Sequence, residues 1–395
     1  MRLKVLILTN LFPHRYDPHR SAFNRQQFER LAAIDDVEVM IAVAFPQRLG
    51  GPKGDPGTAG IRTREFTFVY PPRIGRALHP IFWLTSLLAR FGLELRRSRY
   101  DCLLASWTYP DGVATSWLAR WLGLPYVIKV HGSDLNVLAE SRWRRPQIAR
   151  ALRGAAAVVT VSAALADKCR DLGVAPGQIH VLYNGIDTAR FCPGPRELAR
   201  RSLALPLTDR LILFVGNLKA AKGCIDLIEA YVAVRSRVPS ARLVFVGDGP
   251  ERAGLEARAK AAGVGDEVRL SGVVPHAALA DWYRAADLLC LPSHAEGVPN
   301  VVLEAMACGI PTVATAVGGI PEVLPDTAGV LVPPNDATAL SDALYGVLER
   351  HWDSHSIAAC AKRYRWDDNV RALDAILRQA ARTKTTKERQ QGTPE

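Results

Sequence analysis

The sequence predicts an α/β protein built from two doubly wound, mostly parallel sheets with helices on both faces. Short apolar runs alternate with amphipathic helical patterns, and this alternation indicates parallel strands joined by crossover helices. The same rhythm restarts after residue 208. The length of 395 residues corresponds to about two to three domains. Because open α/β sheets bind ligands outside the carboxyl ends of their strands, each module has a predictable ligand edge.

In the first half, each apolar run is too short for a helix and is flanked by turn residues or helical patterns. Strands are predicted at 4–8, 39–44, 100–106, 125–130, 156–162 and 179–183. Amphipathic patterns predict helices at 22–33, 81–97, 112–122, 145–153 and 163–171. The most membrane-like stretch, 81–95, contains Arg90 and Glu94, so it falls short of the roughly 18 apolar residues that a membrane span needs.

The second half repeats the pattern, with strands predicted at 210–216, 241–247, 267–272, 287–292, 311–315 and 329–333. The stretch between the halves carries prolines and no strand pattern, which is typical of a linker. We therefore expect a first domain over 1–190, a linker over 191–209 and a second domain over 210–382, whose last helix can pack back on the first domain. The polar end, 383–395, is expected to be disordered.

The charge is concentrated in the first half of the chain. The net charge is +11 and the pI is about 9.5, but residues 1–205 hold 29 Lys and Arg against 16 Asp and Glu, and the rest holds 21 against 23. Such an excess favours nucleic acid, a membrane surface or an anionic substrate as partner. The ordinary composition excludes collagen, wholesale disorder and a disulfide scaffold. Seven scattered cysteines form no Cys-x-x-Cys pair, which predicts reduced thiols, a cytoplasmic location and no metal site.

The segment 287–309 carries the most chemical information. A predicted strand ends at Pro292, a loop carries Glu296, and Pro299 stands where a helix would begin. Amides of Gly297, Val298 and Asn300 at that helix start can cradle a phosphate. Glu304, just over one turn inside, can accept hydrogen bonds from ribose hydroxyls. The alternative is a solvated Glu296 and an early-helix Glu304 that is favoured by the helix dipole.

A second segment, 214–230, has the same strand, turn and helix order. Gly216 ends the strand, and Lys219 and Lys222 follow before Gly223 and an amphipathic helix. The Walker pattern is absent, but two lysines beyond a strand end can neutralise a pyrophosphate. The alternative is that both lysines are surface residues that flank a turn.

Taken together, the motifs resemble a known family. GNLKAAKG, VGDGPE, AEGVPNVVLEAMACGIPTVAT and VGGIPEVL, in this order, look like the donor domain of retaining glycosyltransferases of family 4, and HGSD (131–134) and NGID (184–187) also match. The resemblance covers nearly the whole chain and is strongest over 210–332. It implies the GT-B fold, in which two Rossmann-like domains face each other across a cleft.

The resemblance also implies roles for individual residues. Glu304 would hold the nucleotide ribose, Glu296 the transferred sugar, and Lys222 with the amides from Val298 to Val301 the diphosphate. His131 would stand beside the reacting centre. The acceptor or a phosphate would be bound by Arg20, Asp134 and Asn184. Donor binding would further involve Gly216, Asn217, Gly297, Asn300 and, in the base pocket, Val273. Many family members carry Arg at the position of Asn217. For His131 the alternative is a strand-end side chain that is satisfied locally.

The expected activity is transfer of a sugar, with retention, from a UDP- or GDP-linked donor to a saccharide or lipid-linked acceptor, without a metal or other cofactor. The reaction would belong to cell-surface polysaccharide or glycolipid synthesis. The basic segments 81–100 and 141–150 can dock on anionic lipid at the inner face of the cell membrane, or form core-facing helices with a solvated basic face. A nucleotide-sugar epimerase and a non-catalytic nucleotide-sugar-binding subunit are the alternatives. Nucleic acid is not expected, because no recognition module is visible.

Overall fold

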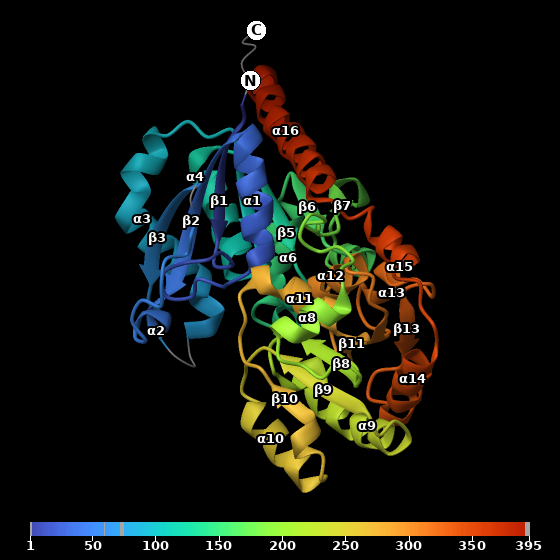
Figure 1. Cartoon of the computed structure of the whole chain (residues 1–395). Coiled ribbons are helices and arrows are strands. Elements are labelled where there is room, and N and C mark those ends of the chain that lie inside the picture. The colour runs from blue at the N-terminus through green and yellow to red at the C-terminus, as the bar shows by residue number, and fades with distance from the viewer. Residues whose placement is uncertain (1, 59, 72–74, 392–395) are drawn as a thin grey trace. The chain divides into compact units, whose positions relative to one another are not determined.

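The protein comprises two compact units, each built around one parallel sheet. The computed structural model describes residues 2–58, 60–71 and 75–391. The contacts within it assign residues 1–185 and 366–395 to the first unit and residues 186–365 to the second. Figure 1 shows each sheet with its helices along both faces. Among the residues described, no helix is both long enough and apolar enough to cross a membrane.

The first unit contains a seven-stranded parallel sheet in the order β3-β2-β1-β4-β5-β6-β7. The order reverses between β1 and β4, which makes their carboxyl ends the switch point where a ligand is expected. The strands are β1 (Lys4–Thr9), β2 (Asp36–Ala44), β3 (Arg62–Phe68), β4 (Cys102–Ser106), β5 (Tyr126–Val130), β6 (Ala157–Thr160) and β7 (Ile179–Val181). The helices are α1 (Ala22–Ile34), α2 (Phe45–Arg48), α3 (His79–Arg97), α4 (Val113–Leu122), α5 (Ser133–Asn136), α6 (Arg145–Arg153), α7 (Ala163–Asp171) and α16 (Trp366–Gln391).

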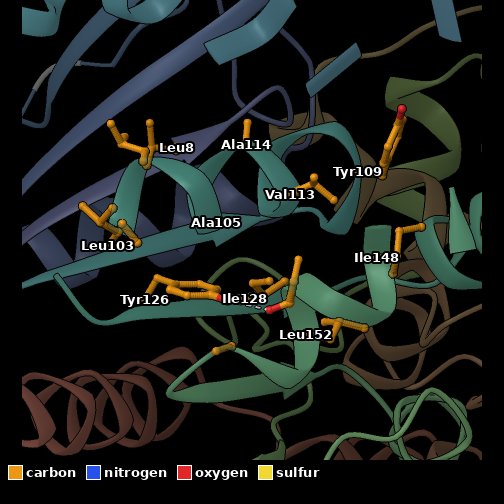
Figure 2. Packing of buried hydrophobic residues seen from close by; sticks show 14 of the residues in the cluster. Leu8, Leu103, Ala105, Tyr109, Val113, Ala114, Tyr126, Ile128, Ile148 and Leu152 are labelled. Atoms are coloured by element: carbon orange, nitrogen blue, oxygen red, sulfur yellow. Dashed lines mark hydrogen bonds between the residues drawn. The ribbon is translucent and has the colours of Figure 1, made fainter. Parts of the chain in front are cut away.

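Two hydrophobic cores lie on the two faces of this sheet. Along β1, Leu6 and Leu8 belong to one core and Val5 and Ile7 to the other, as expected because successive strand residues point to opposite faces. The first core is closed by α3, α4, α6 and α7, and Figure 2 shows part of it around Ile128. The second core is closed by α1 and α16.

The second unit contains a six-stranded parallel sheet in the order β10-β9-β8-β11-β12-β13, with its switch point between β8 and β11. The strands are β8 (Arg210–Val215), β9 (Ala241–Val246), β10 (Val268–Leu270), β11 (Leu288–Leu291), β12 (Thr312–Thr315) and β13 (Gly329–Val332). The helices are α8 (Arg196–Ser202), α9 (Cys224–Arg237), α10 (Arg252–Ala261), α11 (Leu279–Ala285), α12 (Asn300–Ala307), α13 (Ile320–Val323), α14 (Ala337–Glu349) and α15 (Ser354–Ala361).

The predicted fold class is confirmed, and every predicted strand has a counterpart in one of the two sheets. The sequence prediction missed β3. This edge strand pairs with β2 alone, and it carries Arg62, Arg64 and Glu65. Charged residues are common on edge strands because one side of the strand stays in water, so β3 has no continuous apolar run.

The unit boundaries differ from the predicted ranges. The segment 191–209, expected as a linker, contains α8, whose buried Arg200 donates from Nη2 to Asp287 Oδ2 over 2.7 Å. That interaction packs the segment onto the second unit. Helix α16, within the range expected for the second domain and its tail, is assigned to the first unit and packs in its second core, in line with the expectation that the last helix can pack back on the first domain. It continues to Gln391, beyond the expected start of disorder at 383, and residues 392–395 lie outside the described part of the chain.

Candidate functional site

Three loops meet at the carboxyl ends of β8, β11 and β12, and glycines allow them to meet. Gly223, before α9, has φ +66°, and a Cβ there would lie 1.9 Å from the carbonyl oxygen of Pro292, just after β11. Gly318, after β12, has φ +56°, and its Cβ would lie 2.1 Å from the carbonyl oxygen of Glu296. A side chain would be strained at such φ values and would collide with backbone. The sequence therefore brings these loops to the switch point through residues that lack a Cβ.

An ion pair joins two of these loops. Lys222 Nζ lies 2.5 Å from Glu296 Oε1, and Ser293 Oγ donates to the same oxygen over 2.8 Å. The Glu296 side chain is 9% exposed and the Lys222 side chain 31%, so the carboxylate is shielded while the ammonium still reaches solvent. Thr315 Oγ1 donates to the Ser293 carbonyl, which ties the loop to β12. The pair can therefore offer a cation to an anionic ligand and an acceptor to its hydroxyl groups.

Helix α12 begins beside this ion pair. Pro299 is its N-cap residue and Asn300 its first helical residue, so the helix begins one residue later than the sequence predicted. The first N–H groups of a helix have no carbonyl partner within the helix, and they carry the positive end of the helix dipole. Val298 is buried at this end, and Gly297 accepts from the N–H of Gly319 over 2.7 Å. The helix start is thus held against the loop after β12 and is suited to an anion.

Glu304 belongs to a buried network that the sequence did not reveal. Its Oε1 lies 2.7 Å from His276 Nε2, and its Oε2 accepts from the Tyr283 hydroxyl over 2.8 Å. Burial and the neighbouring Glu304 raise the pKa of Tyr283 well above its ordinary value. Glu304 is 6% exposed, and its carboxylate is held by two side chains rather than by the helix dipole alone, which the alternative interpretation had assumed. A carboxylate has about four lone-pair sites, which leaves room for ligand hydroxyls.

Two predicted donor residues are exposed to solvent. Val273 follows the edge strand β10, which β9 separates from β8, and its side chain is 61% exposed. Asn217 is exposed in the loop after Gly216. Their roles in binding a base and a diphosphate remain predictions. The other predicted donor residues lie at the carboxyl edge of β8 and β11 or on α12.

At the switch point of the first unit, His131 follows β5 and contacts the end of β4. Its Nε2 lies 2.8 Å from Ser106 Oγ, which lies 3.1 Å from Asn24 Oδ1 on α1. Burial, together with the charge of Lys129, lowers the pKa of His131 well below its ordinary value of 6.5. A neutral imidazole in this position can exchange hydrogen bonds with Ser106 and with a ligand.

The first unit also buries two carboxyl groups, Asp134 beside the backbone of His131 and Asp111 beside that of Asn10. Asp134 accepts from the backbone N–H groups of Gly132, His131 and Thr108, and burial raises its pKa to about 6. Asp111 accepts from the N–H of Asn10 over 2.7 Å, and burial raises its pKa to about 8. Asp134 therefore shapes the HGSD turn by binding its amides, as an N-terminal cap does.

The predicted residues Asn184 and Arg20 lie near this network. Asn184 Oδ1 accepts from the fully buried Lys129 Nζ over 3.3 Å, and Gln27 Oε1 accepts from the same ammonium over 2.7 Å. Burial lowers the pKa of Lys129 to about 7. Arg20 Nε donates to the Asn10 carbonyl over 2.6 Å. The structure thus brings His131, Asp134, Asn184 and Arg20 to the carboxyl edge of the first sheet or to side chains that contact it.

Sequence reasoning missed several residues of both sites. Lys129 had a visible signal, since it is a lysine within an apolar strand run, and a buried cation needs polar partners. His276 and Tyr283 had none, because they lie 28 and 21 residues from their partner Glu304, and no local pattern predicts such a contact. Ser293 lies only three residues before its partner Glu296, and the sequence analysis did not single it out.

Comparison with known proteins identifies the class. The family described as "Glycosyl transferases group 1" matches residues 195–377, and "Glycosyltransferase Family 4" matches residues 26–190. The chain belongs to glycosyltransferase family 4. It is 30% identical over 358 residues to a protein of Bacillus subtilis (strain 168) named as the teichuronic acid biosynthesis glycosyltransferase TuaC, covering 87% of this chain and 88% of TuaC.

Solved structures match the fold over nearly the whole chain. Sucrose-phosphate synthase from Thermosynechococcus elongatus superposes with a TM-score of 0.75 at 24% identity, covering 95% of this chain and 98% of that chain. Anabaena HepE, solved in complex with UDP, superposes with a TM-score of 0.74 at 20% identity, covering 95% and 99%. At these identities the likeness concerns the fold, which is GT-B. The protein is thus a glycosyltransferase of family 4 with two Rossmann-like domains.

Proposed function

We propose that this protein transfers a hexose, with retention, from a UDP- or GDP-linked donor to a saccharide or lipid-linked acceptor in the synthesis of a cell-surface polysaccharide or glycolipid. The observation that carries the proposal is the Lys222–Glu296 ion pair at the switch point of the second sheet. Its cation and carboxylate match the diphosphate and the sugar hydroxyls of such a donor. The name of TuaC supports a role in glycan synthesis, and the UDP bound to HepE supports a uridine nucleotide.

The donor-binding roles follow the local chemistry. Lys222 and the first amides of α12 neutralise the diphosphate, Glu304 accepts hydrogen bonds from the ribose, and Glu296 accepts them from the transferred sugar. In the first unit, neutral His131 is the candidate for contact with the reacting groups. Placing these groups before reaction and stabilising the leaving diphosphate are the two sources of rate enhancement in this proposal.

The proposed chemical step is a substitution on one face of the sugar. The bond between the anomeric carbon and the diphosphate oxygen breaks, and the acceptor oxygen bonds to the same carbon on the same face. The acceptor proton passes to the departing phosphate oxygen. The nucleoside diphosphate leaves with the electron pair of the broken bond, so the step needs no oxidant and no protein nucleophile.

The test combines a donor screen with the stereochemistry of the product. Thermal shift with UDP-glucose, GDP-mannose and ADP-glucose identifies the donor that the native state binds, because such a ligand raises stability by mass action. Proton NMR of the product formed from that donor and a lipid-linked or free saccharide then reads the new linkage. An α-linkage from an α-linked donor is expected. A β-linkage would overturn retention, and a shift by none of the three donors would overturn the nucleotide-sugar assignment.

The same assay separates the two alternatives named from the sequence. A nucleotide-sugar epimerase would convert the donor without an acceptor, and a non-catalytic subunit would bind the donor without turnover. Transfer that requires an acceptor contradicts both. We also expect activity to persist in EDTA, because the proposed roles of Lys222 and the α12 amides leave no step to a metal ion. Loss of activity in EDTA that Mg²⁺ restores would overturn that part.

The proposal includes an anionic membrane surface as partner of the first unit. Leu93 on α3 is 78% exposed and Trp143, before α6, is 63% exposed, while Arg142 lies over the Trp143 ring at 4.8 Å. Exposed aromatic residues beside arginines suit a lipid interface. Flotation with vesicles of phosphatidylglycerol and phosphatidylcholine should exceed that with phosphatidylcholine alone, and Trp143→Ala should reduce it. Equal flotation with both vesicles would overturn this partner.

A further inference from the structure

A cavity in the second unit lies at the amino-terminal end of its strands. It measures about 610 Å³, within the range of small-molecule sites. Arg210 begins β8, Asp287 precedes β11 and Pro311 precedes β12, and all three line the cavity. The donor residues lie instead at the carboxyl ends of these strands. The two sites are therefore separate.

The cavity is lined by several cationic side chains, although the half of the chain that forms it carries almost no net charge. Its lining includes Arg196, Arg210, Arg284 and Arg350, with His351 beside them, and Asp287 is the one acidic residue among the described residues that line it. Residues 206–395 hold 21 Lys and Arg against 23 Asp and Glu. The arginines of the cavity therefore do not simply reflect a high overall positive charge in this half of the chain.

Arg284 is paired with Asp281 over 3.0 Å, but Asp287 does not balance the remaining arginines. Its carboxylate lies 2.5 Å from Arg196 Nη1, 2.7 Å from Arg200 Nη2 and 3.8 Å from Arg210 Nη1. One negative charge therefore faces three guanidinium groups. The Arg196 and Arg210 side chains are 50% and 45% exposed, so the excess charge reaches the open part of the cavity.

Helix dipoles explain only part of the cluster. Arg284 lies in the last turn of α11, where a cation is favourable, and it donates to the carbonyls of Cys192 and Arg190. Arg350 caps the end of α14. Arg196, however, is the first residue of α8, where the helix dipole disfavours a cation. The anion beside Arg196 is Asp287, which Arg196 shares with Arg200 and Arg210.

Residues at and after the end of α14 also line the cavity. Arg350 lies 4.2 Å from the Trp352 ring centroid, and neither Arg350 nor His351 has an acidic partner among the residues the structure describes. Ile310, Val347 and Leu348 supply apolar surface. Arginines that are free to form bidentate contacts suit phosphate oxygens, and the apolar surface suits the organic part of a ligand.

We infer that this cavity binds a small molecule that bears one or more phosphate groups, at a site distinct from the donor site. The ligand's phosphate contacts Arg196, Arg210 and Arg350, and its remainder lies against Ile310 and Leu348. The cavity also contacts Gly309, just after α12, whose other end carries the donor residues. This inference does not depend on the proposed donor or acceptor.

The test is calorimetric titration of the full chain with inorganic pyrophosphate. Lys222→Ala serves as the background, because it removes the cation of the donor site. Saturable binding is expected in that background, and adding Arg210→Ala and Arg350→Ala should weaken it at least tenfold. The matched control adds Arg237→Ala and Arg258→Ala, two arginines of the same unit that lie outside the cavity, and should keep the affinity.

Two outcomes would overturn the inference. One is the absence of saturable binding in the Lys222→Ala background, and the other is an affinity that the Arg210 and Arg350 changes leave within twofold of that background. Should the alanine variant not fold, as judged by circular dichroism, the Arg210→Gln and Arg350→Gln pair keeps the side-chain stems and carries the same expectation. Transferase activity of the Arg210 and Arg350 variants is expected to remain, which separates this site from the donor site.

Discussion

The two sheets share one winding order, but their switch points carry opposite kinds of chemistry. In the second unit Lys222 and Glu296 form an ion pair where glycines allow the loops to meet. In the first unit burial lowers the pKa values of His131 and Lys129 and raises those of Asp111 and Asp134. Desolvation thus drives the first set toward neutrality. One fold thus presents a charged site that is suited to the proposed anionic donor and a less charged site that is suited to the hydroxyl groups of the proposed acceptor.

The largest effect is expected from breaking the charged pair. Lys222→Ala and Glu296→Ala should each lower turnover by about 100-fold or more, because removing one group that stabilises developing charge typically costs that much. Circular dichroism should show an unchanged fold, since the pair lies at loops rather than in the core. Initial rates with saturating acceptor provide the measurement.

Lys219→Ala is the matched control for Lys222→Ala. Lys219 is an exposed lysine of the same loop, and it makes no ion pair among the described residues. Its removal should change turnover by less than about fivefold. Near-normal transfer in both the Lys222 and Glu296 variants would contradict the assignment of the site.

The second comparison concerns the glycines that bring the loops together. Gly223→Ala should lower the free energy of unfolding by about 2 kcal/mol more than Gly263→Ala, because overpacking costs about 1–3 kcal/mol. Both glycines have positive φ, +66° and +71°, but a Cβ at Gly263 would meet nothing within 4 Å. Urea unfolding followed by fluorescence measures both variants. Equal losses would mean that the loop after β11 moves without cost.

The buried Lys129 offers a test of the first unit by pH. Its pKa falls from 10.5 to about 7 on folding, so between these values the unfolded chain binds a proton that the folded chain does not. Stability should therefore rise with pH in this window, by about 1.4 kcal/mol for each pH unit. Urea unfolding at pH 8 and pH 9 should show this rise in the wild type but not in Lys129→Met. The control is Lys260→Met at an exposed lysine, which should keep the rise in stability with pH. If Lys129→Met also keeps that rise, the assignment to Lys129 is contradicted.

The smallest effect is expected in the network around Glu304. Tyr283→Phe removes one hydrogen bond to its carboxylate, which is worth about 1 kcal/mol, so donor affinity should fall about fivefold. Tyr231→Phe removes a buried hydroxyl that donates to the Ala241 carbonyl over 2.8 Å, away from the donor residues. It should lower stability and leave donor affinity unchanged. Both variants are titrated with the donor that binds best. Equal donor affinity in Tyr283→Phe and Tyr231→Phe would contradict the role of Tyr283.

The same contrast explains what the sequence could predict. Parallel strands that are buried on both faces produce apolar runs, and the glycine and proline positions around Glu296 predicted the loop and the start of α12. Edge strand β3 was missed because one of its sides faces water. The partners of Glu304 were missed because His276 and Tyr283 come from a different element, and packing rather than spacing brings them to the carboxylate.

The first-unit network illustrates the same limit. Lys129, Gln27 and Asn184 come from β5, α1 and the segment after β7, so only the folded chain shows that the lysine is fully buried. The unit boundaries depended on long-range contacts as well. Arg200 makes the expected linker part of the second unit, because its guanidinium meets the Asp287 carboxylate that precedes β11.

The most direct test of the charged donor site is hydrogen exchange by mass spectrometry. The full chain is measured with and without the better binder of UDP-glucose and GDP-mannose. Protection is predicted in peptides that cover 216–223, 293–304 and 317–319, and Lys222→Ala should reduce it at the same ligand concentration. Protection confined to residues 1–185, with these loops unchanged, would contradict the central claim that the second unit's switch point binds the donor.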